Sequence, residues 1–501
     1  MMERHDAVVA IIAANIGEYF DRQEPFRIYH GSTNSTRQSK HRRDNIVDIS
    51  TLTNVLYVDK EKKTVLVEPN VPMDKLVEET MRHGLVPLVV MEFPGITVGG
   101  GFSGTSGESS SFRHGVFDRT VNWIEMVTPN GTKVTASPTN RADLFRGAAS
   151  ACGTLGVVTL LEVQLMEAKK YVQLKYHLAS SIQEAIRKIE EATDDTSNDY
   201  LDGIIFAKDQ IVICSGRLTN SLPEGASIQR FTRAQDPWFY GHAERRIVNA
   251  VDDYVPLVDY LFRYNRGGFW VGKYVLNYFM TPFNRVTRYL FNRLLQPRMM
   301  YHGFHESGLS KEYIIQDTPV PYQASDEFFS WLHDNLGFYP LWICPLRHQQ
   351  ATDSPFDLLA DRNDDKNEYY LLNFGVWGPG PKRHQEIVEQ NRKLERKVQE
   401  LGGKKVLYAH TYYTEEEFWS IYNRKTYDAL RERYHATHLP TVYDKVKVDF
   451  DAEERAIRTS RKAWLRALFW SIWPLGGLYG VFRAWKGGNY LIQNDKKQKE
   501  D

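Results

Sequence analysis

The sequence predicts a chain of the α+β class that contains two or three domains. At 501 residues the chain exceeds the size at which a single hydrophobic core stops growing. Short segments of alternating apolar residues, such as 45–50, 54–59 and 64–69, predict strands, whereas the helical spacing of 73–84 predicts a helix that ends at Gly84. Strands and helices are mixed along the chain in this way, which is typical of α+β domains.

The first domain is predicted to span residues 1–168. Residues 1–20 carry apolar side chains at helical spacing and predict an amphipathic packing helix rather than a secretory signal. After an apolar strand at 85–90, residues 121–137 predict a hairpin around Pro129-Asn130-Gly131. Residues 142–166 then predict a short helix, a glycine-bearing turn and the closing strand of the domain.

Two further regions differ from the first in amino-acid composition. Residues 169–450 are rich in aromatic side chains, as in "YNRGGFWVGKYVLNYFM" and "FYPLWICPL", and predict an α+β domain with a large apolar pocket or face. Residues 451–501 form a tail. Within it, 464–486 combine tryptophans with flanking Arg and Lys, but only 16 uncharged residues separate Arg466 from Arg483. A bilayer span needs about 20, so we expect an interfacial anchor or, alternatively, a helix docked on the core and broken near Pro474.

Charge and cysteine usage exclude several classes of protein. The 63 basic and 63 acidic side chains cancel, and nucleic-acid binding requires a basic excess, so no nucleic-acid partner is expected. Three widely spaced cysteines form no C-x-x-C pair, which favours a reducing compartment. His302 and His305 have no partners at ligand spacing, and no metal site is expected. Cys152 is interpreted as a small buried packing residue.

Three stretches rich in glycine and hydroxyl residues interrupt the first domain, at 31–37, 95–110 and 152–157. The second, "GITVGGGFSGTSGESS", predicts a loop, since neither a helix nor a strand favours that composition. Glycine lets the backbone approach a ligand closely, which suits a pyrophosphate or a heterocycle. A set of tight turns is the alternative. Neither nucleotide fingerprint occurs, so a nucleotide would be bound by a non-Rossmann arrangement.

The segments 67–76, 84–115 and 143–159 together resemble the FAD-binding domain of the vanillyl-alcohol-oxidase (PCMH-type) flavoenzymes. In that family the dinucleotide lies between two α+β subdomains, and a cap domain covers the flavin. The resemblance implies that residues 1–168 form a two-subdomain PCMH-type FAD-binding domain. Residues 169–450 would then be an α+β cap or substrate domain that includes a C-terminal segment in contact with the flavin.

A narrower resemblance runs from about residue 25 to residue 446. The motifs "GFSGTSGESSSFRHG", "RYNRGGFW", "YPLWICPL", "LYAHTYYTEEEFWSIYNRKTYDALRERY" and "PTVYDKV" are similar to the 24-dehydrocholesterol reductase (delta-24-sterol reductase) family. This implies an FAD-dependent oxidoreductase of the CH-CH class that reduces a C=C bond of a sterol or related isoprenoid lipid with NADPH. It also implies an intracellular, membrane-associated location at the endoplasmic reticulum, with the cytoplasm as the alternative. The family member known for the activity has an N-terminal membrane segment, which we do not expect here, so another lipid-like substrate stays open.

Two other functions stay open on the same fold. One is an FAD-dependent oxidase or dehydrogenase of a sugar alcohol, aldonolactone or lipid-linked sugar. The other is a lipid-binding protein without catalytic activity. The oligomeric state is left open.

The resemblance implies three groups of cofactor-binding residues. They are Gly31, Ser32, Thr33, Asn34 and Ser35; Gly99, Gly100, Thr105, Gly107, Ser109, Ser110 and Gly115; and Gly153, Thr154, Gly156 and Val157. Non-covalent FAD is expected. His30 precedes its glycine, whereas the relatives that bind FAD covalently have a Gly-Gly-His run, and His114 matches a position where the sterol-reductase relatives need no histidine.

The resemblance also implies residues for the reaction. Tyr427, Arg431 or Lys445 is expected to face the flavin, with Arg431 and Lys445 favoured because a cation stabilises the negative charge of a reduced flavin. The spacing alone favours a surface helix with Tyr427 and Leu430 packed inward. Saturating a C=C bond also needs a proton donor. His410, Tyr412 and Glu108 are the candidates, and the sequence does not choose among them.

Overall fold

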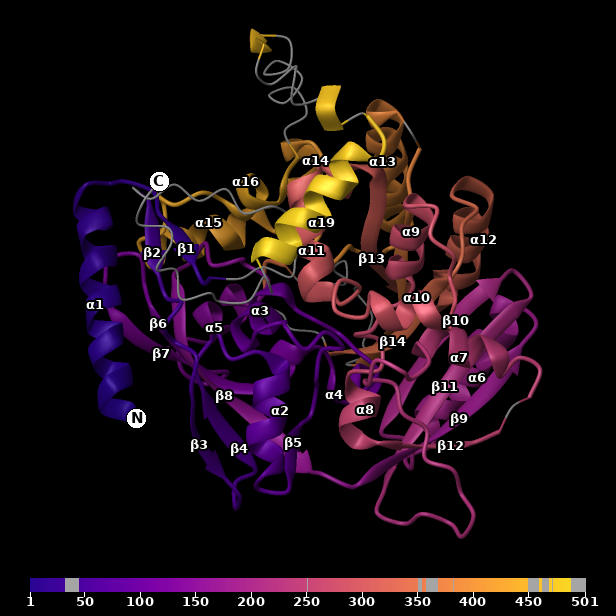
Figure 1. Ribbon diagram of the computed structural model, residues 1–501. Coiled ribbons are helices and arrows are strands. Elements are labelled where there is room, and N and C mark those ends of the chain that lie inside the picture. Colours follow the sequence, from indigo (N-terminus) through magenta and orange to yellow (C-terminus); the bar gives the residue numbers. More distant parts are fainter. Residues whose placement is uncertain are drawn as a thin grey trace.

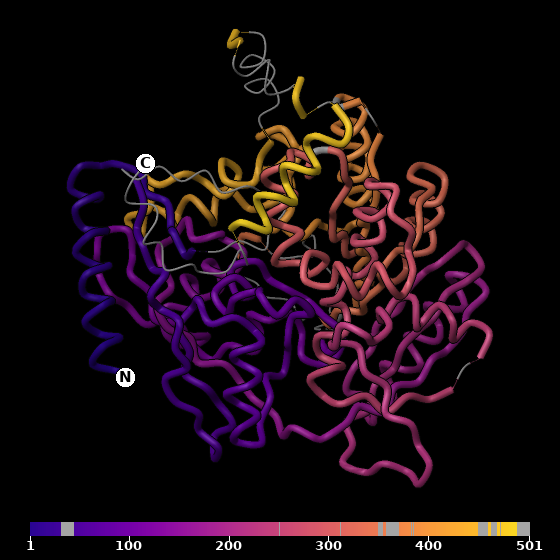
Figure 2. The backbone as a smooth tube through the Cα atoms, viewed as in Figure 1, coloured from indigo at the N-terminus to yellow at the C-terminus, as the bar shows by residue number. Residues whose placement is uncertain are grey.

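The computed structural model describes residues 1–31, 45–249, 251–349, 354–356, 368–381, 383–448, 459–461, 468–470 and 472–487. The chain forms two main sheets that lie side by side, with helices around them (Figure 1). The first third of the chain builds one half of the molecule and the middle builds the other (Figure 2). The helices that follow this middle part lie across the top of both halves, so the two halves are joined by more than one crossing of the chain.

The first half is built on a six-stranded antiparallel sheet with the order β3-β4-β8-β6-β7, in which β5 also pairs with β8. Its strands are β3 (Val55–Asp59), β4 (Thr64–Val67), β5 (Leu85–Pro87), β6 (Val121–Val127), β7 (Lys133–Ala136) and β8 (Val157–Glu167). A parallel pair lies beside it, β1 (Arg27–Tyr29) and β2 (Ile46–Asp48). The predicted hairpin and closing strand are confirmed, and the strand predicted at 85–90 is shorter than expected.

The helices of this half are α1 (Met2–Asp21), α2 (Met73–Met81), α3 (Val98–Gly104), α4 (Ser111–His114), the 3-10 turn η1 (Phe117–Thr120) and α5 (Ala142–Ala148). The predicted helices at 1–20 and 73–84 and the short one at the start of 142–166 are therefore confirmed. α1 is amphipathic, as its spacing predicts: Val9, Ile12 and Ile16 are buried in a cluster with residues of β2 and β6, whereas Ile11 is 71% exposed.

The glycine stretch at 95–110 was predicted as a loop, and that prediction is wrong for its middle. Residues Val98–Gly104 form α3, whose N-cap Thr97 accepts a hydrogen bond from the backbone N–H of Gly100. The physical reason is packing. A Cβ atom on Gly99 would lie 2.7 Å from Cβ of Pro69, and one on Gly101 would overlap Met91. Glycine is therefore required here because the helix lies against its neighbours, at the cost of helix propensity.

The second half is built on a seven-stranded antiparallel sheet with the order β12-β9-β11-β10-β14-β15-β13. Its strands are β9 (Tyr171–Ala179), β10 (Tyr200–Ala207), β11 (Gln210–Thr219), β12 (Asp253–Pro256), β13 (Tyr313–Pro321), β14 (Leu341–Gln349) and β15 (Glu368–Pro379). β8 ends the first sheet at Glu167 and β9 begins the second at Tyr171. The chain thus passes from one sheet to the other within three residues.

The two faces of the second sheet are buried differently. Three helices, α6 (Ile182–Asp194), α12 (Ser325–Asn335) and α13 (His384–Glu400), share one hydrophobic cluster with one face. The opposite face contributes Trp342 and Trp377 to the main cluster, which also contains the core of the first half. The remaining helical segments of this half are α7 (Phe239–Arg245), α8 (Leu257–Leu261), α9 (Val271–Tyr278), α10 (Arg285–Leu290), α11 (Pro297–Ser307), η2 (Leu309–Glu312) and η3 (Tyr322–Ala324).

After the second sheet the chain returns to the first half. This segment contains α14 (Glu415–Ile421), α15 (Arg424–Arg433) and α16 (Val442–Val446). α15 packs on α5, and Nζ of Lys445 donates to the carbonyl of Cys152 at 2.7 Å. The C-terminal segment predicted to contact the cofactor therefore lies beside the glycine-bearing turn of the first half.

The last described helix, α19 (Leu475–Gly487), packs on α11. The predicted break falls at Pro474, directly before the helix, but Gly476 and Gly477 do not break it. They lie with Gly480 on the buried face, where a Cβ on Gly480 would lie 2.6 Å from the carbonyl oxygen of Gly303. In the part of the chain that is described, no helix has both the length and the apolar character to cross a membrane.

His5 fixes α1 to the first sheet through two carboxylates. Its Nδ1 lies 2.9 Å from Oε1 of Glu68 and its Nε2 lies 3.1 Å from Oε1 of Glu125. Burial lowers the pKa of His5, but the hydrogen bonds and charges of Glu125 and Glu68 outweigh burial and raise this pKa to about 9. His5 is therefore a protonated, buried link at neutral pH.

This link predicts a pH-dependent stability. The pKa of His5 is raised in the folded state from 6.5 to about 9, so its stabilisation is complete below the lower value and is lost as pH rises through the higher one. The unfolding free energy of the wild type minus that of His5→Gln should shrink by about 3 kcal/mol between about pH 6 and about pH 10, measured by urea unfolding. A difference that is constant over this range would contradict the assignment.

Candidate active site

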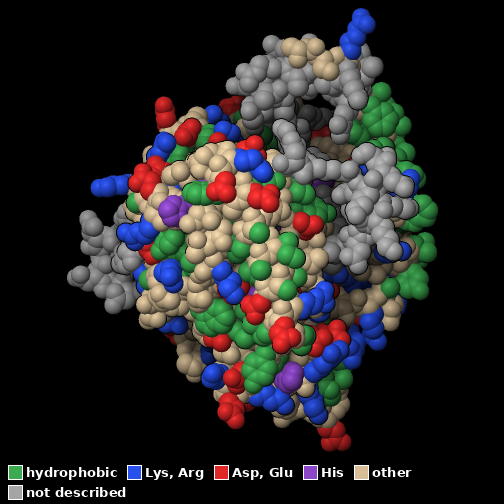
Figure 3. All heavy atoms as spheres, turned by 90° about the vertical axis from the view of Figure 1, so that its left-hand side faces the viewer, with side chains coloured by type: hydrophobic (Ala, Val, Ile, Leu, Met, Phe, Trp, Pro, Cys, Tyr) green, Lys and Arg blue, Asp and Glu red, His purple; other side chains and the backbone are tan. Residues whose placement is uncertain are grey.

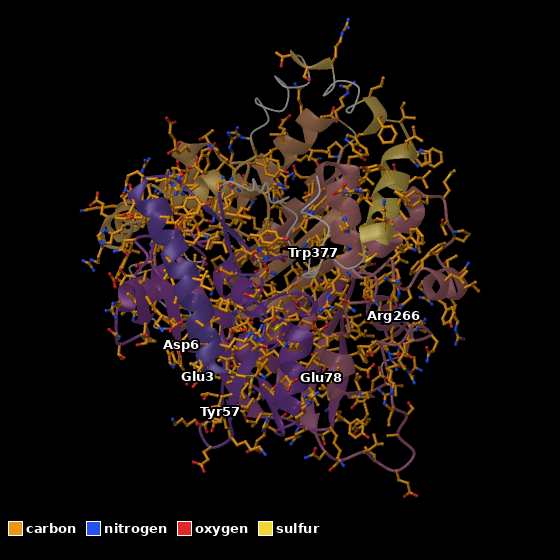
Figure 4. The ribbon with its side chains drawn as sticks, turned by 60° about the vertical axis from the view of Figure 1, so that its left-hand side comes forward. Glu3, Asp6, Tyr57, Glu78, Arg266 and Trp377 are labelled. Carbon is orange, nitrogen blue, oxygen red and sulfur yellow. The ribbon has the colours of Figure 1, made fainter. Side chains whose placement is uncertain are left out.

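A cavity of about 430 Å³ lies between the two sheets. Its walls come from α3, from the turn before β8, from α11 and from the face of the second sheet that the helices α6, α12 and α13 leave free. Trp377, which lines the cavity, lies in the middle of the molecule (Figure 4) and is 8% exposed. The cavity therefore joins two walls that are built from different halves of the chain.

The first wall consists mainly of backbone. Nine residues of the glycine stretch line it, namely Ile96, Thr97, Gly99, Gly100, Ser103, Gly104, Thr105, Ser106 and Gly107. Gly153 and Gly156 join them from the turn before β8. Gly156 has φ of +138°, and a Cβ there would lie 2.6 Å from the carbonyl oxygen of Val127, so only glycine allows this turn. Where glycine carries no side chain, a flat or phosphorylated ligand can approach the backbone, as a dinucleotide requires.

Six of the predicted cofactor-binding residues are brought together in this wall: Gly99, Gly100, Thr105, Gly107, Gly153 and Gly156. Ser32, Thr33, Asn34 and Ser35 lie outside the described residues. Gly31 is described but does not line the cavity; His30 before it does. Cys152 also lines the cavity and is only half-buried, so the interpretation as a buried packing residue is incomplete.

The other predicted cofactor-binding residues have structural partners instead. The Ser109 hydroxyl donates to Oε2 of Glu108 at 2.8 Å, and the Ser110 backbone N–H donates to Oε1 at 2.9 Å. Gly115 ends α4 with φ of +76°. Thr154 accepts a hydrogen bond from Tyr427, and Val157 begins β8 within the cluster under α1. These residues shape the wall from behind and are not part of its surface.

Of the six residues predicted for the reaction, only Lys445 lines the cavity. The Tyr427 hydroxyl donates to Oγ1 of Thr154 at 2.7 Å. Nη2 of Arg431 donates to three carbonyls that follow α15, those of Ala436, Thr437 and Leu439, at 3.1, 3.0 and 2.6 Å. Both side chains therefore hold the return segment in place. His410 lies outside the lining, and its carbonyl accepts from Nε2 of Gln316 at 3.2 Å.

The remaining candidates from the sequence also lie outside the lining. The Tyr412 backbone N–H donates to Oε1 of Glu395 at 3.0 Å. Burial, with the charges of Arg113 and Arg347, lowers the pKa of His114 to about 4. Among the described residues no group of three His, Cys, Asp or Glu side chains could hold a metal ion.

Glu92 is a cavity residue that sequence reasoning missed. It lines the first wall near α3 and is 8% exposed, and its Oε1 has no hydrogen-bond partner among the described residues. Burial raises its pKa well above the ordinary value, and the charge of the neighbouring Glu108 adds to the shift. Burial also raises the pKa of Glu108, which lies behind the wall. Glu92 follows an apolar run that reads as a buried strand, so its sequence context gives no signal.

The second wall is aromatic. Phe269, Trp342 and Trp377 line it, with a ring-centroid separation of 4.3 Å between Phe269 and Trp377. Gly267 and Gly268 have φ of +82° and +49°, and this turn carries Phe269 into the cavity. α11 adds three side chains, Met300, Tyr301 and Phe304. The prediction that residues 169–450 contain a large apolar pocket agrees with this wall.

One polar cluster interrupts the aromatic wall. Asp317 on β13 accepts a hydrogen bond from the Tyr408 hydroxyl at 2.7 Å and one from Nδ2 of Asn373 on β15 at 3.0 Å. All three residues line the cavity. Burial raises the pKa of Asp317 to about 6, although both hydrogen bonds act to lower it. The sequence does not indicate this cluster because Asn373 and Tyr408 lie 56 and 91 residues from Asp317 along the chain.

The comparisons with known proteins agree with this division. Residues 7–137, which include α3, match the FAD binding domain family. The chain is 28% identical to the Delta(24)-sterol reductase of Homo sapiens over 422 residues, 83% of this chain and 80% of that protein. It is 28% identical to the Delta(24)-sterol reductase of Pisum sativum over 453 residues, 84% of this chain and 79% of that protein.

A more distant relative matches about a third of the chain. Cytokinin dehydrogenase 9 of Oryza sativa subsp. japonica is 30% identical over 163 residues, 32% of this chain and 27% of that protein. The α3 part of the backbone-lined wall falls within the residues matched by the FAD binding domain, whereas Gly153, Gly156 and the aromatic wall lie beyond them. The chain thus carries a PCMH-type FAD-binding domain in its first half and is similar, over most of its length, to proteins named Delta(24)-sterol reductase.

Proposed function

We propose that this protein is an FAD-dependent reductase that saturates a carbon–carbon double bond of a sterol or related isoprenoid lipid, with NADPH as the electron source. One observation carries the proposal: a single cavity joins a backbone-lined wall in the FAD-binding domain to an aromatic wall in the second half. The similarity to Delta(24)-sterol reductases, which spans both halves, supports it.

The residues of the first wall fit a flavin dinucleotide. Gly99, Gly100, Gly104 and Gly156 would hold it through their backbone, and Lys445 would place a cation at the same wall. When bound and reduced, FAD supplies a hydride. The protein itself must exclude water, hold the alkene against the flavin and deliver a proton.

The second wall favours a lipid over a polyol. A sugar alcohol presents hydroxyls that need hydrogen-bond partners, whereas Phe269, Trp342 and Trp377 offer apolar ring surface. An isoprenoid chain buries apolar surface against such rings and requires few polar contacts. The oxidation of a sugar alcohol is therefore the less favoured activity.

We further propose that α19 rests on a lipid bilayer, from which such a substrate would come. On its outer face Leu478, Phe482 and Trp485 are 52%, 51% and 63% exposed, and Arg483 and Lys486 stand beside them. Figure 3 shows hydrophobic side chains gathered along the right-hand edge, the side that carries α19. Exposed apolar and aromatic side chains mixed with basic ones are typical of an interfacial membrane surface.

The exposed surface continues beyond α19. Nε1 of Trp473 donates to the carbonyl of Tyr278 at 2.8 Å, which joins the start of α19 to the end of α9. Met280 follows, 74% exposed, and α10 adds three more exposed side chains, Val286, Tyr289 and Leu290. α19 also packs on α11, which lines the cavity. Helix α11 therefore lies between α19 and the cavity.

The proposed reaction predicts a two-step behaviour of the flavin. Purified protein should be yellow and release FAD on acid precipitation. Mixed anaerobically with NADPH, the flavin should bleach, and 24-dehydrocholesterol should restore the yellow colour at one equivalent per flavin. Bleaching by a polyol, followed by rapid recovery of the colour in oxygen, would assign an oxidase instead. Protein that binds sterol but whose flavin no donor bleaches would be a lipid-binding protein.

The backbone-lined wall predicts that a side chain at Gly104 displaces the flavin. A Cβ at Gly104 would meet only Oγ of Ser106, at 3.8 Å, so Gly104→Val should fold and project into the cavity. The Kd for FAD, measured by titration of the apoprotein, should rise by about tenfold or more, and tenfold corresponds to about 1.4 kcal/mol of binding free energy. The FAD-to-protein ratio after gel filtration should fall accordingly. Gly241→Val is the matched control, because it lies in helix α7, has nothing within 4 Å of its Cβ and does not line the cavity. Full FAD content in Gly104→Val would contradict the placement.

The bilayer surface predicts binding to vesicles. Wild-type protein should float with phosphatidylcholine–phosphatidylserine vesicles, and Phe482→Ser/Trp485→Ser should lower the partition coefficient by about tenfold or more, since each side chain loses apolar burial. Ile11→Ser/Tyr57→Ser is the control, because both residues are at least 60% exposed and lie in the first half, as Figure 4 shows for Tyr57. Equal flotation of all three proteins would refute the surface, and a dimer lost only in the α19 variant would assign it to a second copy.

A further inference from the structure

Asp317 and Tyr408 form a polar pair within the aromatic wall. The binding of a flavin to the opposite wall gives this pair no role. Their side chains are joined by a 2.7 Å hydrogen bond and both line the cavity. Asn373 donates to the second oxygen of Asp317 at 3.0 Å, so the carboxyl group is held in one orientation. An acid group is buried at a cost unless it is neutral or paired, and neither partner of Asp317 is a cation.

We propose that Tyr408 is the catalytic acid of the reduction and that Asp317 is the positioning residue that supplies its proton. This inference rests on the proposed function. In the carboxylate state the Tyr408 hydroxyl donates to Asp317. In the carboxylic acid state Asp317 can donate to the phenolic oxygen, and the proton of Tyr408 is then directed into the cavity.

The step balances in atoms and electrons. The alkene π pair forms a new C–H bond with the proton of Tyr408 as the O–H bond of Tyr408 breaks. The O–H bond of Asp317 breaks at the same time, and its proton restores the hydroxyl of Tyr408. The other alkene carbon accepts a hydride from reduced flavin, so both electrons come from that group. Asp317 is left as a carboxylate and regains one proton from water.

The surrounding rings suit this order of events. An isolated alkene is a weak base, so positive charge develops on its second carbon as the proton arrives. Trp342, Trp377 and Phe269 line the same cavity, and the faces of aromatic rings stabilise positive charge. Hydride transfer then removes that charge.

The ionisation of Asp317 sets the pH dependence. The titratable groups that face it are Tyr408, from the segment after α13, and Tyr301, from α11, and burial raises the pKa of both phenols. The pKa of Asp317 itself is raised to about 6 by burial. Because the acid form is the active one, the rate of alkene saturation should be constant below this pH and fall about tenfold per pH unit above it.

The test compares Tyr408→Phe and Asp317→Asn with the control Tyr274→Phe, whose hydroxyl donates to the carbonyl of Tyr339 and does not line the cavity. NADPH should bleach the flavin at the wild-type rate in all three. Reoxidation by 24-dehydrocholesterol in a single turnover should be slower by about a hundredfold or more in the first two, because general acid catalysis typically contributes at least that factor to the rate. In the control the rate should stay within about threefold of wild type. The pH profile of residual activity should be flat in Asp317→Asn.

A second readout does not depend on turnover. Infrared difference spectra of the holoenzyme should show the carbonyl stretch of a protonated carboxylic acid that titrates near pH 6 and is absent in Asp317→Asn. Tyr408→Phe should shift this titration, because a hydrogen bond to the carboxylate is lost. Binding of 24-dehydrocholesterol, followed by quenching of tryptophan fluorescence, should be retained in both variants.

The failures of the two proposals are distinguishable. If wild-type flavin, once bleached, is not reoxidised by the sterol, the proposed reaction fails. If wild type turns over but Tyr408→Phe reduces the alkene within about threefold of wild type, the relay is overturned. The same holds if deuterium uptake from heavy water is lost in Glu92→Gln and retained in Tyr408→Phe, since Glu92 is the other buried acid in the lining.

Discussion

The rest of the structure depends on how the second sheet buries the face opposite α6, α12 and α13. Those three helices cover the first face. The opposite face carries Trp342 and Trp377, large apolar surfaces that water solvates poorly. Their rings pack against Phe269 and Trp270 of their own half, and they share one core cluster with the FAD-binding half. Because the α3 side of the cavity is rich in glycine, the two surfaces enclose a cavity instead of closing completely.

A buried charge holds the aromatic wall in position. Asp202 on β10 accepts hydrogen bonds from Arg263 at 2.8 Å, from the Tyr264 hydroxyl at 2.7 Å and from the indole N–H of Trp342 at 3.1 Å. Asp202 and Arg263 are almost completely buried. Removing one partner of such a pair leaves an uncompensated charge in a medium of low dielectric. The orientation of Trp342 is thus fixed by electrostatics as well as by packing.

The sequence predicts the first half well because its elements are local. The periodicity of α1, the hairpin at β6 and β7 and the glycine-bearing turn before β8 each follow from short-range patterns. The α3 helix does not follow from a short-range pattern. Its glycines are required because the helix packs closely against Pro69 and Met91, and not because the backbone needs conformational freedom. The six glycines among these sixteen residues therefore have two structural reasons: some allow close packing, and others leave the wall of the cavity without side chains.

The candidate site shows the same division. Glycines that line the cavity could be found from their motifs, and so could Lys445, whereas Tyr427 and Arg431 carry the family motif but hold the return segment. Asp317, Asn373 and Tyr408 come from three segments that only the sheet order brings together. Their partners are set by tertiary contacts, which a motif cannot encode.

The two ends of the cavity then follow from one arrangement of the chain. A wall that exposes backbone requires small residues. Most of them come from one stretch of the chain, so this wall is visible in the sequence as a motif. Side chains at the other wall require only that each strand contribute one residue, because neighbouring strands lie about 5 Å apart. A glycine-rich wall that is visible in the sequence and an aromatic wall that is not are therefore both consequences of a cavity that lies between a glycine-rich helix and the face of a sheet.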